Sequence, residues 1–308
     1  AAAGPRFALV ACRWLGCCAL LGGCWGCCCS PLVVVASSAG RHGGGIALAD
    51  TSGALVNTTL VNTTAADSGG GVVILDGYAG SIAALDVSGS VAVRGGALAG
   101  SATNITDLTA TSCSALFGGG VWASLGVTPA PLILIGGAIE SSTATSGGGG
   151  GAAAVGGSAS VLRLVGTRVV ACSASDPGHA LLAIDAGRLE LVDVVIANPA
   201  GSEGAVAVVG TDSVVDAHSC DVVVTDMGGR AFAALAHGSL LLTQITVARG
   251  GLVVDAGYAT LDSVAFSNAH VIGSGGAILV SHVAAPGSVV FTDVSLFNCS
   301  ATAYGGAL

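Results

Sequence analysis

The chain has 308 residues, of which 52% are hydrophobic and 9% are charged, with a net charge of −9. This composition excludes a disordered chain, because disordered segments are poor in apolar residues and rich in charge. It also argues against a nucleic-acid partner, since all nine basic residues are arginines and they form no basic cluster. Short runs of Val, Leu, Ile and Thr between Gly, Ser and Asp predict many short strands.

The N-terminal segment, residues 1–40, differs in composition from the rest. Residues 14–40 carry no charge and follow two arginines, and small residues at 33–40 suit a cleavage site. This pattern favours an export signal; a single membrane anchor and a chain start that is not the native one are the alternatives. Seven of the eleven cysteines lie within 12–29 without the spacing of a zinc site, which fits a Cys-rich apolar leader. We therefore expect a secreted or cell-surface protein that touches a membrane only through this segment.

From residue 41 to residue 308 a Gly-Gly-apolar phrase recurs with a mean spacing of about 26 residues. Repeats of this length are the signature of stacked architectures such as solenoids. A glycine pair allows the positive φ angles and the close backbone approach that a sharp corner requires. Intact phrases begin at Gly44, Gly70, Gly95, Gly119, Gly150, Gly228, Gly250, Gly275 and Gly305, and degenerate ones begin at Gly178 and Glu203.

Each period predicts a Gly-Gly corner, three short strands separated by a turn and an Asx bend, and a corner with Asn or Cys. Three such strands enclose no core alone, but copies stacked about 4.8 Å apart form parallel sheets around an aliphatic interior. The sequence thus predicts an all-β fold, a right-handed single-stranded parallel β-helix (β-solenoid) of about ten coils over residues 41–308. Leu308 ends on a corner without a polar cap, so we expect a chain truncated at its C-terminus.

The segments "LVNTTLVNTTA", "LVDVVIANPA" and "FTDVSLFNCSA" place an Asx residue before an apolar triplet and an Asn after it. Side-chain amides stacked on successive coils predict a structural ladder at this second position. In "GTRVVACSA" we align Thr167 with the Asx bend, which puts Arg168 at an apolar position and indicates a slipped register or a locally open coil. The predicted ladder consists of Asn62, Cys172, Asn198, Asn268 and Asn298.

The phrases "GGAI", "GGAL" and "GGGV", combined with "FSNA", "LFNCSA" and "LVNTTA", resemble the repeats of polymorphic outer membrane proteins and related surface proteins. The resemblance covers roughly residues 41–308 and implies the pectin-lyase-like right-handed β-helix group. No strict F-x-x-N motif occurs, and the C-terminal membrane barrel of that family has no counterpart in this sequence. The resemblance implies a non-catalytic structural or adhesive rod.

The same fold group includes polysaccharide lyases and hydrolases, so the resemblance also implies a uronan-cleaving enzyme as an alternative. The motifs of its sugar-cleaving members, Asp-Asp, Gly-His-Gly and Arg-x-Lys, are absent, and we interpret His179 as a surface variant of a corner glycine. A lyase would need Arg as base beside clustered carboxylates. The candidates are Arg163, Arg168, Arg188 and Asp193, with Asp185 and Glu190 nearby. We favour the alternative of an exposed charge ladder and predict no catalytic residue.

Metal and cofactor sites are not predicted. Aspartates recur after the corners without the spacing of calcium-binding β-rolls, and Asp is a common turn residue; they are Asp50, Asp76, Asp185 and Asp255. Of four N-x-S/T sequons, Asn62 and Asn298 occupy the corner and are expected to turn inward, which leaves Asn104 and Asn57 as glycosylation sites. The expected partners are extracellular polysaccharides, cell-wall polysaccharides or surface proteins.

Overall fold

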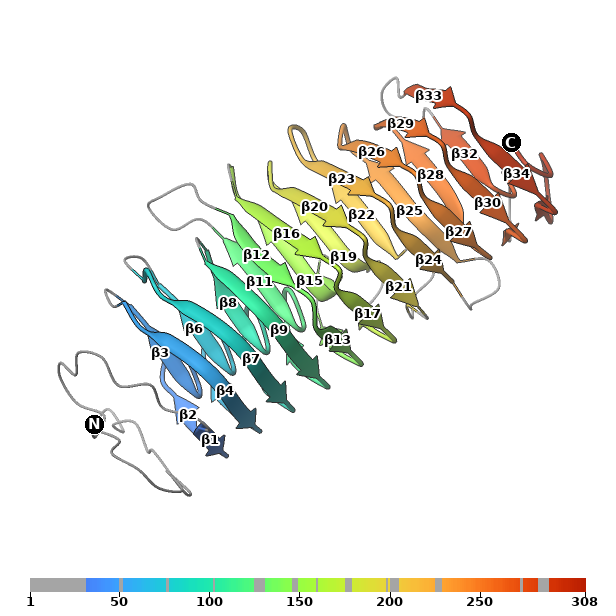
Figure 1. The fold of residues 1–308 in the computed structure, drawn as a ribbon. Coiled ribbons are helices and arrows are strands. Elements are labelled where there is room, and N and C mark those ends of the chain that lie inside the picture. Colours follow the sequence, from blue (N-terminus) through green and yellow to red (C-terminus); the bar gives the residue numbers. More distant parts are fainter. Residues whose placement is uncertain are drawn as a thin grey trace.

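The computed structural model in Figure 1 describes residues 32–308 apart from short gaps. The gaps fall at residues 50–51, 76–77, 102, 125–130, 146–148, 159, 175–178, 198, 200–204, 225–228, 272–273 and 282–287. Every regular element of the described chain is a β-strand, and all strand pairs are parallel. The protein is therefore an all-β parallel β-solenoid, as the repeat predicts. The predicted leader falls largely on residues 1–31, which lie outside the described residues.

The largest sheet has 18 strands. It is bent, and most coils contribute two strands to it, one on each side of the bend. Its strands are β1 (Leu32–Val35), β4 (Ala54–Val61), β7 (Ser81–Ser88), β9 (Asn104–Thr111), β12 (Leu132–Ile135), β13 (Ala138–Glu140), β16 (Val161–Val165), β17 (Arg168–Val170), β20 (Arg188–Val192), β21 (Val195–Ala197), β23 (Val214–His218), β24 (Asp221–Val223), β26 (Ser239–Thr243), β27 (Thr246–Ala248), β29 (Tyr258–Asp262), β30 (Ala265–Ser267), β33 (Ser288–Thr292) and β34 (Ser295–Phe297). We call it the bent sheet.

A second sheet of ten strands follows the Gly-Gly corners, and we call it the corner sheet. Its strands are β3 (Ile46–Leu48), β6 (Val72–Ile74), β8 (Leu98–Gly100), β11 (Val121–Ser124), β15 (Gly150–Gly156), β19 (His179–Ile184), β22 (Val206–Val209), β25 (Arg230–Leu235), β28 (Gly251–Asp255) and β32 (Ile278–Ser281). Short strands between the sheets are β2 (Ser38–Ala39), β5 (Thr64–Ala65), β10 (Ser114–Ala115), β14 (Thr143–Ala144), β18 (Ser173–Ala174), β31 (His270–Val271) and β35 (Ser300–Ala301).

The ten passes through the corner sheet give about nine full turns of about 26 residues, and Figure 1 shows them stacked into an elongated body. The described solenoid begins ahead of residue 41, where the repeat alone places its start. Strand β1 already pairs in parallel with β4, with Leu32 opposite Thr58. Residues 32–40 therefore belong to the first coil.

The core is built by alternation along each strand. In β16 the side chains of Leu162 and Leu164 are buried, while Arg163 between them faces solvent. Leu162 lies opposite Leu189 of the next coil, and both are fully buried. Each buried leucine stabilises the fold by about 1.5–3 kcal/mol, so stacked aliphatic columns hold the coils together.

A single-residue bend divides the two strands that most coils contribute to the bent sheet, and the same bend lies within the long strands β4, β7 and β9. Asx residues occupy it in several coils, with Asn57 at φ 49° and Asp193 at φ 54°. Asn and Asp tolerate this left-handed conformation better than other residues with a β-carbon, which explains the recurring Asx in the sequence.

The coil that contains Arg168 is closed and in register, so the predicted slip is wrong. Gly166 takes the bend at φ 58°, and Thr167 points inward and is buried. Arg168 pairs with Val195 of the next coil, and 61% of its side chain is exposed. Our alignment was one residue off, because glycine adopts the left-handed conformation at this bend as readily as Asx does.

The Gly-Gly corners stack directly on one another. The amide of Gly44 donates to the carbonyl of Gly69 at 3.0 Å, and the amide of Gly70 donates to that of Gly95 at 3.1 Å. A β-carbon on Gly70 would lie 2.3 Å from the carbonyl oxygen of Gly96. Only glycine fits this contact, which is why the repeat is visible as a glycine phrase.

Candidate functional site

Charged side chains of three successive coils gather on the outer face of the bent sheet. In β16, β20 and β23, Arg163 lies opposite Glu190, and Glu190 lies opposite Asp216. In-register parallel pairing thus places two carboxylates next to each other. Like charges at this separation repel, so a cation is needed between them.

Arg188 supplies that cation. Its Nε donates to Glu190 Oε1 at 2.7 Å, and its Nη2 donates to Asp216 Oδ2 at 2.9 Å. Arg163 Nε lies 3.9 Å from Glu190 Oε2, an ion pair beyond hydrogen-bonding distance. We call these four residues, Arg163, Arg188, Glu190 and Asp216, the charged cluster.

Two predicted site residues lie apart from the charged cluster. Arg168 forms its ion pair with Glu140, with Nη1 3.8 Å from Oε1. Asp193 occupies the exposed bend between β20 and β21 and forms no ion pair within the described part of the chain. The four candidates therefore do not converge on one point, and the guanidinium of Arg188 already donates to both carboxylates.

The predicted Asn ladder has one amide contact among the described residues. Nδ2 of Asn298 donates to Oδ1 of Asn268 at 2.7 Å, and the two corners have φ angles of 51° and 54°. Asn62 has φ 54°, but its neighbour on the next coil is Gly89, which has no side chain to continue a ladder. Asn198 lies outside the described residues.

Cys172 is not in the column of corner asparagines. Ala171 takes the corner at φ 52°, and Cys172 follows it and points into the core. Its neighbours in this inner column are Ser142 on the preceding coil and, one coil further, Cys113. The prediction placed Cys172 one residue out of register.

The corner asparagines face solvent, so the expectation that Asn62 and Asn298 turn inward is wrong. Both side chains are exposed, as are Asn57 and Asn104. The left-handed corner residue projects outward, and the residue after it, Thr63 or Cys299, turns toward the core. Burial therefore does not separate the four sequons.

Burial tests one further expectation, that of His179, and also sets the state of three cysteines. His179 is only 4% exposed in the first position of β19, so it is not the surface variant that the sequence suggested. Burial raises the pKa of Cys113 and of Cys220 to about 11 and that of Cys172 to about 12. These three thiols are free and stay protonated at neutral pH, so they are poor nucleophiles.

A groove of about 400 Å³ that sequence reasoning missed lies on the outer face of the corner sheet. One wall is a column of residues that directly precede the Gly-Gly corners, and isolated parallel bridges join its members in order. This corner column consists of His42, Ser68, Arg94 and Phe117, of which the first three line the groove. A signal for this column was present in the sequence. The residues before the glycine corners recur at nearly constant spacing, and their residue types differ from coil to coil.

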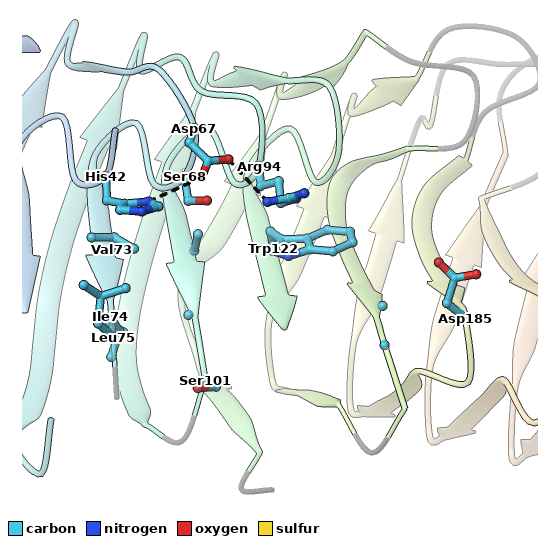
Figure 2. Close-up of a pocket in the computed structure, with 14 residues that line it drawn as sticks. His42, Asp67, Ser68, Val73, Ile74, Leu75, Arg94, Ser101, Trp122 and Asp185 are labelled. Carbon is cyan, nitrogen blue, oxygen red and sulfur yellow. Dashed lines mark hydrogen bonds and ion pairs between the residues drawn. The ribbon is translucent and has the colours of Figure 1, made fainter. Parts of the chain in front are cut away.

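Figure 2 shows the polar and aromatic side chains of this groove side by side along the first coils. Arg94 Nη1 lies 3.3 Å from Asp67 Oδ1, and His42 Nδ1 lies 3.7 Å from Asp67 Oδ2. The ring of Trp122 packs at a tilt of 54° against Phe117, with centroids 5.8 Å apart. The groove thus combines an aromatic side chain with an ion pair.

No protein family, curated protein or solved structure matches the chain. The structure supports the parallel β-solenoid, and no relative supports the resemblance to polymorphic outer membrane proteins or the pectin-lyase-like group. Across the described coils, no three His, Cys, Asp or Glu side chains lie close enough together to hold a metal ion. None of the described segments is a helix that could span a membrane.

Proposed function

We propose that the protein is a non-catalytic, secreted or cell-surface solenoid rod with a structural and adhesive role. The observation that carries this proposal is the charged cluster, in which Arg188 is bonded to carboxylates of its own coil and of the next. An arrangement of this kind neutralises stacked like charges and ties neighbouring coils together. A catalytic arginine would instead need donors directed at a substrate.

The stacked architecture also favours a rod. Each coil contacts mainly its neighbours, so length and stiffness grow with the number of coils and an extended outer surface becomes available for binding. Polysaccharides and surface proteins are the partners that we propose for this surface.

Two measurements test the proposal. The full chain is incubated with pectin, polygalacturonate and alginate, and new reducing ends and unsaturated uronides are measured against the Arg163→Ala, Asp193→Ala double variant. We expect equal background from both proteins. Polysaccharide cleavage by the wild-type chain above that of the double variant would contradict the structural role.

The Arg188→Met variant tests the same interpretation by stability. Arg188, Glu190 and Asp216 are partly exposed, so the loss of their ion pairs is expected to lower the free energy of unfolding by about 0.2–1 kcal/mol at low salt. Salt screens the repulsion between Glu190 and Asp216, so the difference between the two proteins shrinks at high ionic strength. A variant as stable as the wild type at low salt would show that the bridge has no structural value.

A polysaccharide-active enzyme is the second candidate function. It is favoured by one observation, the gathering of two arginines and two carboxylates on a single exposed sheet face. It is the less favoured proposal, because the carboxylates are engaged by Arg188 and because Asp193 lies outside the cluster. The cleavage assay above decides between the two.

A further inference from the structure

The groove beside the Gly-Gly corners has the size and the lining of a small-molecule site. Its volume of about 400 Å³ lies in the range of pockets that hold ligands of one or two rings. Such sites combine apolar and aromatic walls with a few placed polar groups. Here Leu75, which is 40% exposed, and the accessible edge of Trp122 provide the apolar part of the lining, whereas Val73 and Ile74 are nearly fully buried beneath it.

The position of the Trp122 ring depends on a glycine of the next coil. A β-carbon on Gly156 would lie 2.9 Å from Cη2 of Trp122, closer than carbon atoms approach without displacement. Gly156 therefore leaves room for the indole, and Gly156 and Gly157 both line the groove. The part of Trp122 that remains accessible, 9% of its surface, borders the groove.

The opposite wall presents hydrogen-bonding groups of both kinds. Asp67 can accept from a ligand, and Arg94, nearly half exposed, has donors beyond the Nη1 that faces Asp67. His42 Nδ1 is buried without a hydrogen-bond partner, since the 3.7 Å to Asp67 is too long for one. An unpaired polar atom is unfavourable, and the His42 side chain is 30% exposed, so a ligand hydroxyl that pairs with the imidazole gains affinity.

The charge of the groove selects against acidic ligands. Two carboxylates line it, those of Asp67 and Asp185, against the single guanidinium of Arg94. Among these three side chains the negative charges are in excess by one, which disfavours the binding of a uronate. A pyranose without a carboxylate has apolar C–H faces for Trp122 and hydroxyls for the polar wall.

We propose that this groove binds one or two residues of a neutral glycan, packed against the accessible edge of Trp122 and hydrogen-bonded by Asp67, Arg94 and His42. The inference rests on the proposed adhesive role and names the ligand class for it. The site lies on the corner sheet, away from the charged cluster of the bent sheet.

The test uses Trp122 as its own reporter. In the full chain the other two tryptophans are replaced, Trp14→Phe and Trp25→Phe, so that all indole emission comes from Trp122. Cellotriose, xylotriose, mannotriose and tri-N-acetylchitotriose are titrated separately, with trigalacturonate as the acidic comparison. We expect at least one neutral sugar to change the emission with Kd of about 1 mM or tighter, and trigalacturonate to bind at least about tenfold more weakly.

Calorimetric titration of variants with the best neutral sugar follows. Asp67→Asn, which keeps the shape of the side chain, and Gly156→Val, which displaces the ring, are each expected to weaken binding at least about tenfold. Tyr258→Ala removes an aromatic ring that is 44% exposed on the bent sheet, and it should leave the affinity unchanged. Circular dichroism establishes that each variant is folded.

Three results would overturn the inference: no emission change with any of the four neutral sugars at about 10 mM, tighter binding of trigalacturonate, or equal losses from Tyr258→Ala and Asp67→Asn. Absence of both sugar binding and polysaccharide cleavage would refute this site and leave the proposed rod function in place. Cleavage of a polysaccharide would refute the rod function whatever the outcome at Trp122.

Discussion

Replacing Asn268 by alanine is expected to destabilise the C-terminal coils by about 1–2 kcal/mol. The corner backbone has φ 54°, and Asn268 accepts a hydrogen bond from Asn298 at 2.7 Å. The amide contact is exposed, so its loss costs at most about 1 kcal/mol. Ala171 occupies the same corner in another coil at φ 52°, so this corner tolerates alanine. The part of the destabilisation that comes from placing alanine in the left-handed conformation therefore stays at about 1 kcal/mol.

Two variants separate these contributions. Asn268→Gly removes the amide but adopts the left-handed conformation freely, so it should lose less stability than Asn268→Ala. Asn104→Ala changes an exposed residue at the start of β9 that has no positive φ, and its cost should stay below about 0.5 kcal/mol.

The assay combines urea denaturation with native-state hydrogen exchange. Stability in stacked repeats is partly local, so a midpoint for the whole chain could hide a change in two coils. The amide of Asn268, which donates to the carbonyl of Phe297 at 2.9 Å, reports on the corner itself. Equal midpoints and equal protection of this amide in Asn268→Ala and Asn104→Ala would show that the reasoning about the corner is wrong.

Two further predictions concern the glycine corners and the buried thiols. Gly70→Ala places a β-carbon 2.3 Å from a carbonyl oxygen of the next coil, so it should lower the free energy of unfolding, measured by heat or urea, by about 3 kcal/mol or more. Gly40→Ala, whose β-carbon would have nothing within 4 Å, should leave the stability nearly unchanged. Two variants of equal stability would contradict the stacking argument. The raised pKa values of Cys113, Cys172 and Cys220 mean that the folded thiols keep their protons while unfolded thiols lose theirs near pH 9. The contribution of these thiols to stability is therefore constant below pH 9 and falls between pH 9 and about 12. Unfolding midpoints across this range should fall less steeply in the triple Cys→Ala variant, and an identical slope would refute the assignment.

The repeat, the all-β class and the parallel stacking could be predicted from the sequence, because they depend on local chemistry. A corner that accepts no β-carbon must be glycine, so it leaves a visible phrase such as Gly69-Gly70-Gly71. Alternation of apolar and exposed residues, as in Val161–Val165, marks which side of each strand faces the core.

Only the tertiary structure decided how the coils align. A shift of one residue exchanges the inner and outer faces of a strand, and glycine or Asx can each take the bend, so sequence alone misplaced Arg168 and Cys172 by one position. Which residues meet across coils depends on this register. It brings Glu190 beside Asp216 with Arg188 between them, and it joins His42, Ser68 and Arg94 into one wall of a groove. These contacts link residues more than twenty positions apart, and coils of unequal length hide such pairs until the backbone hydrogen bonds set the alignment.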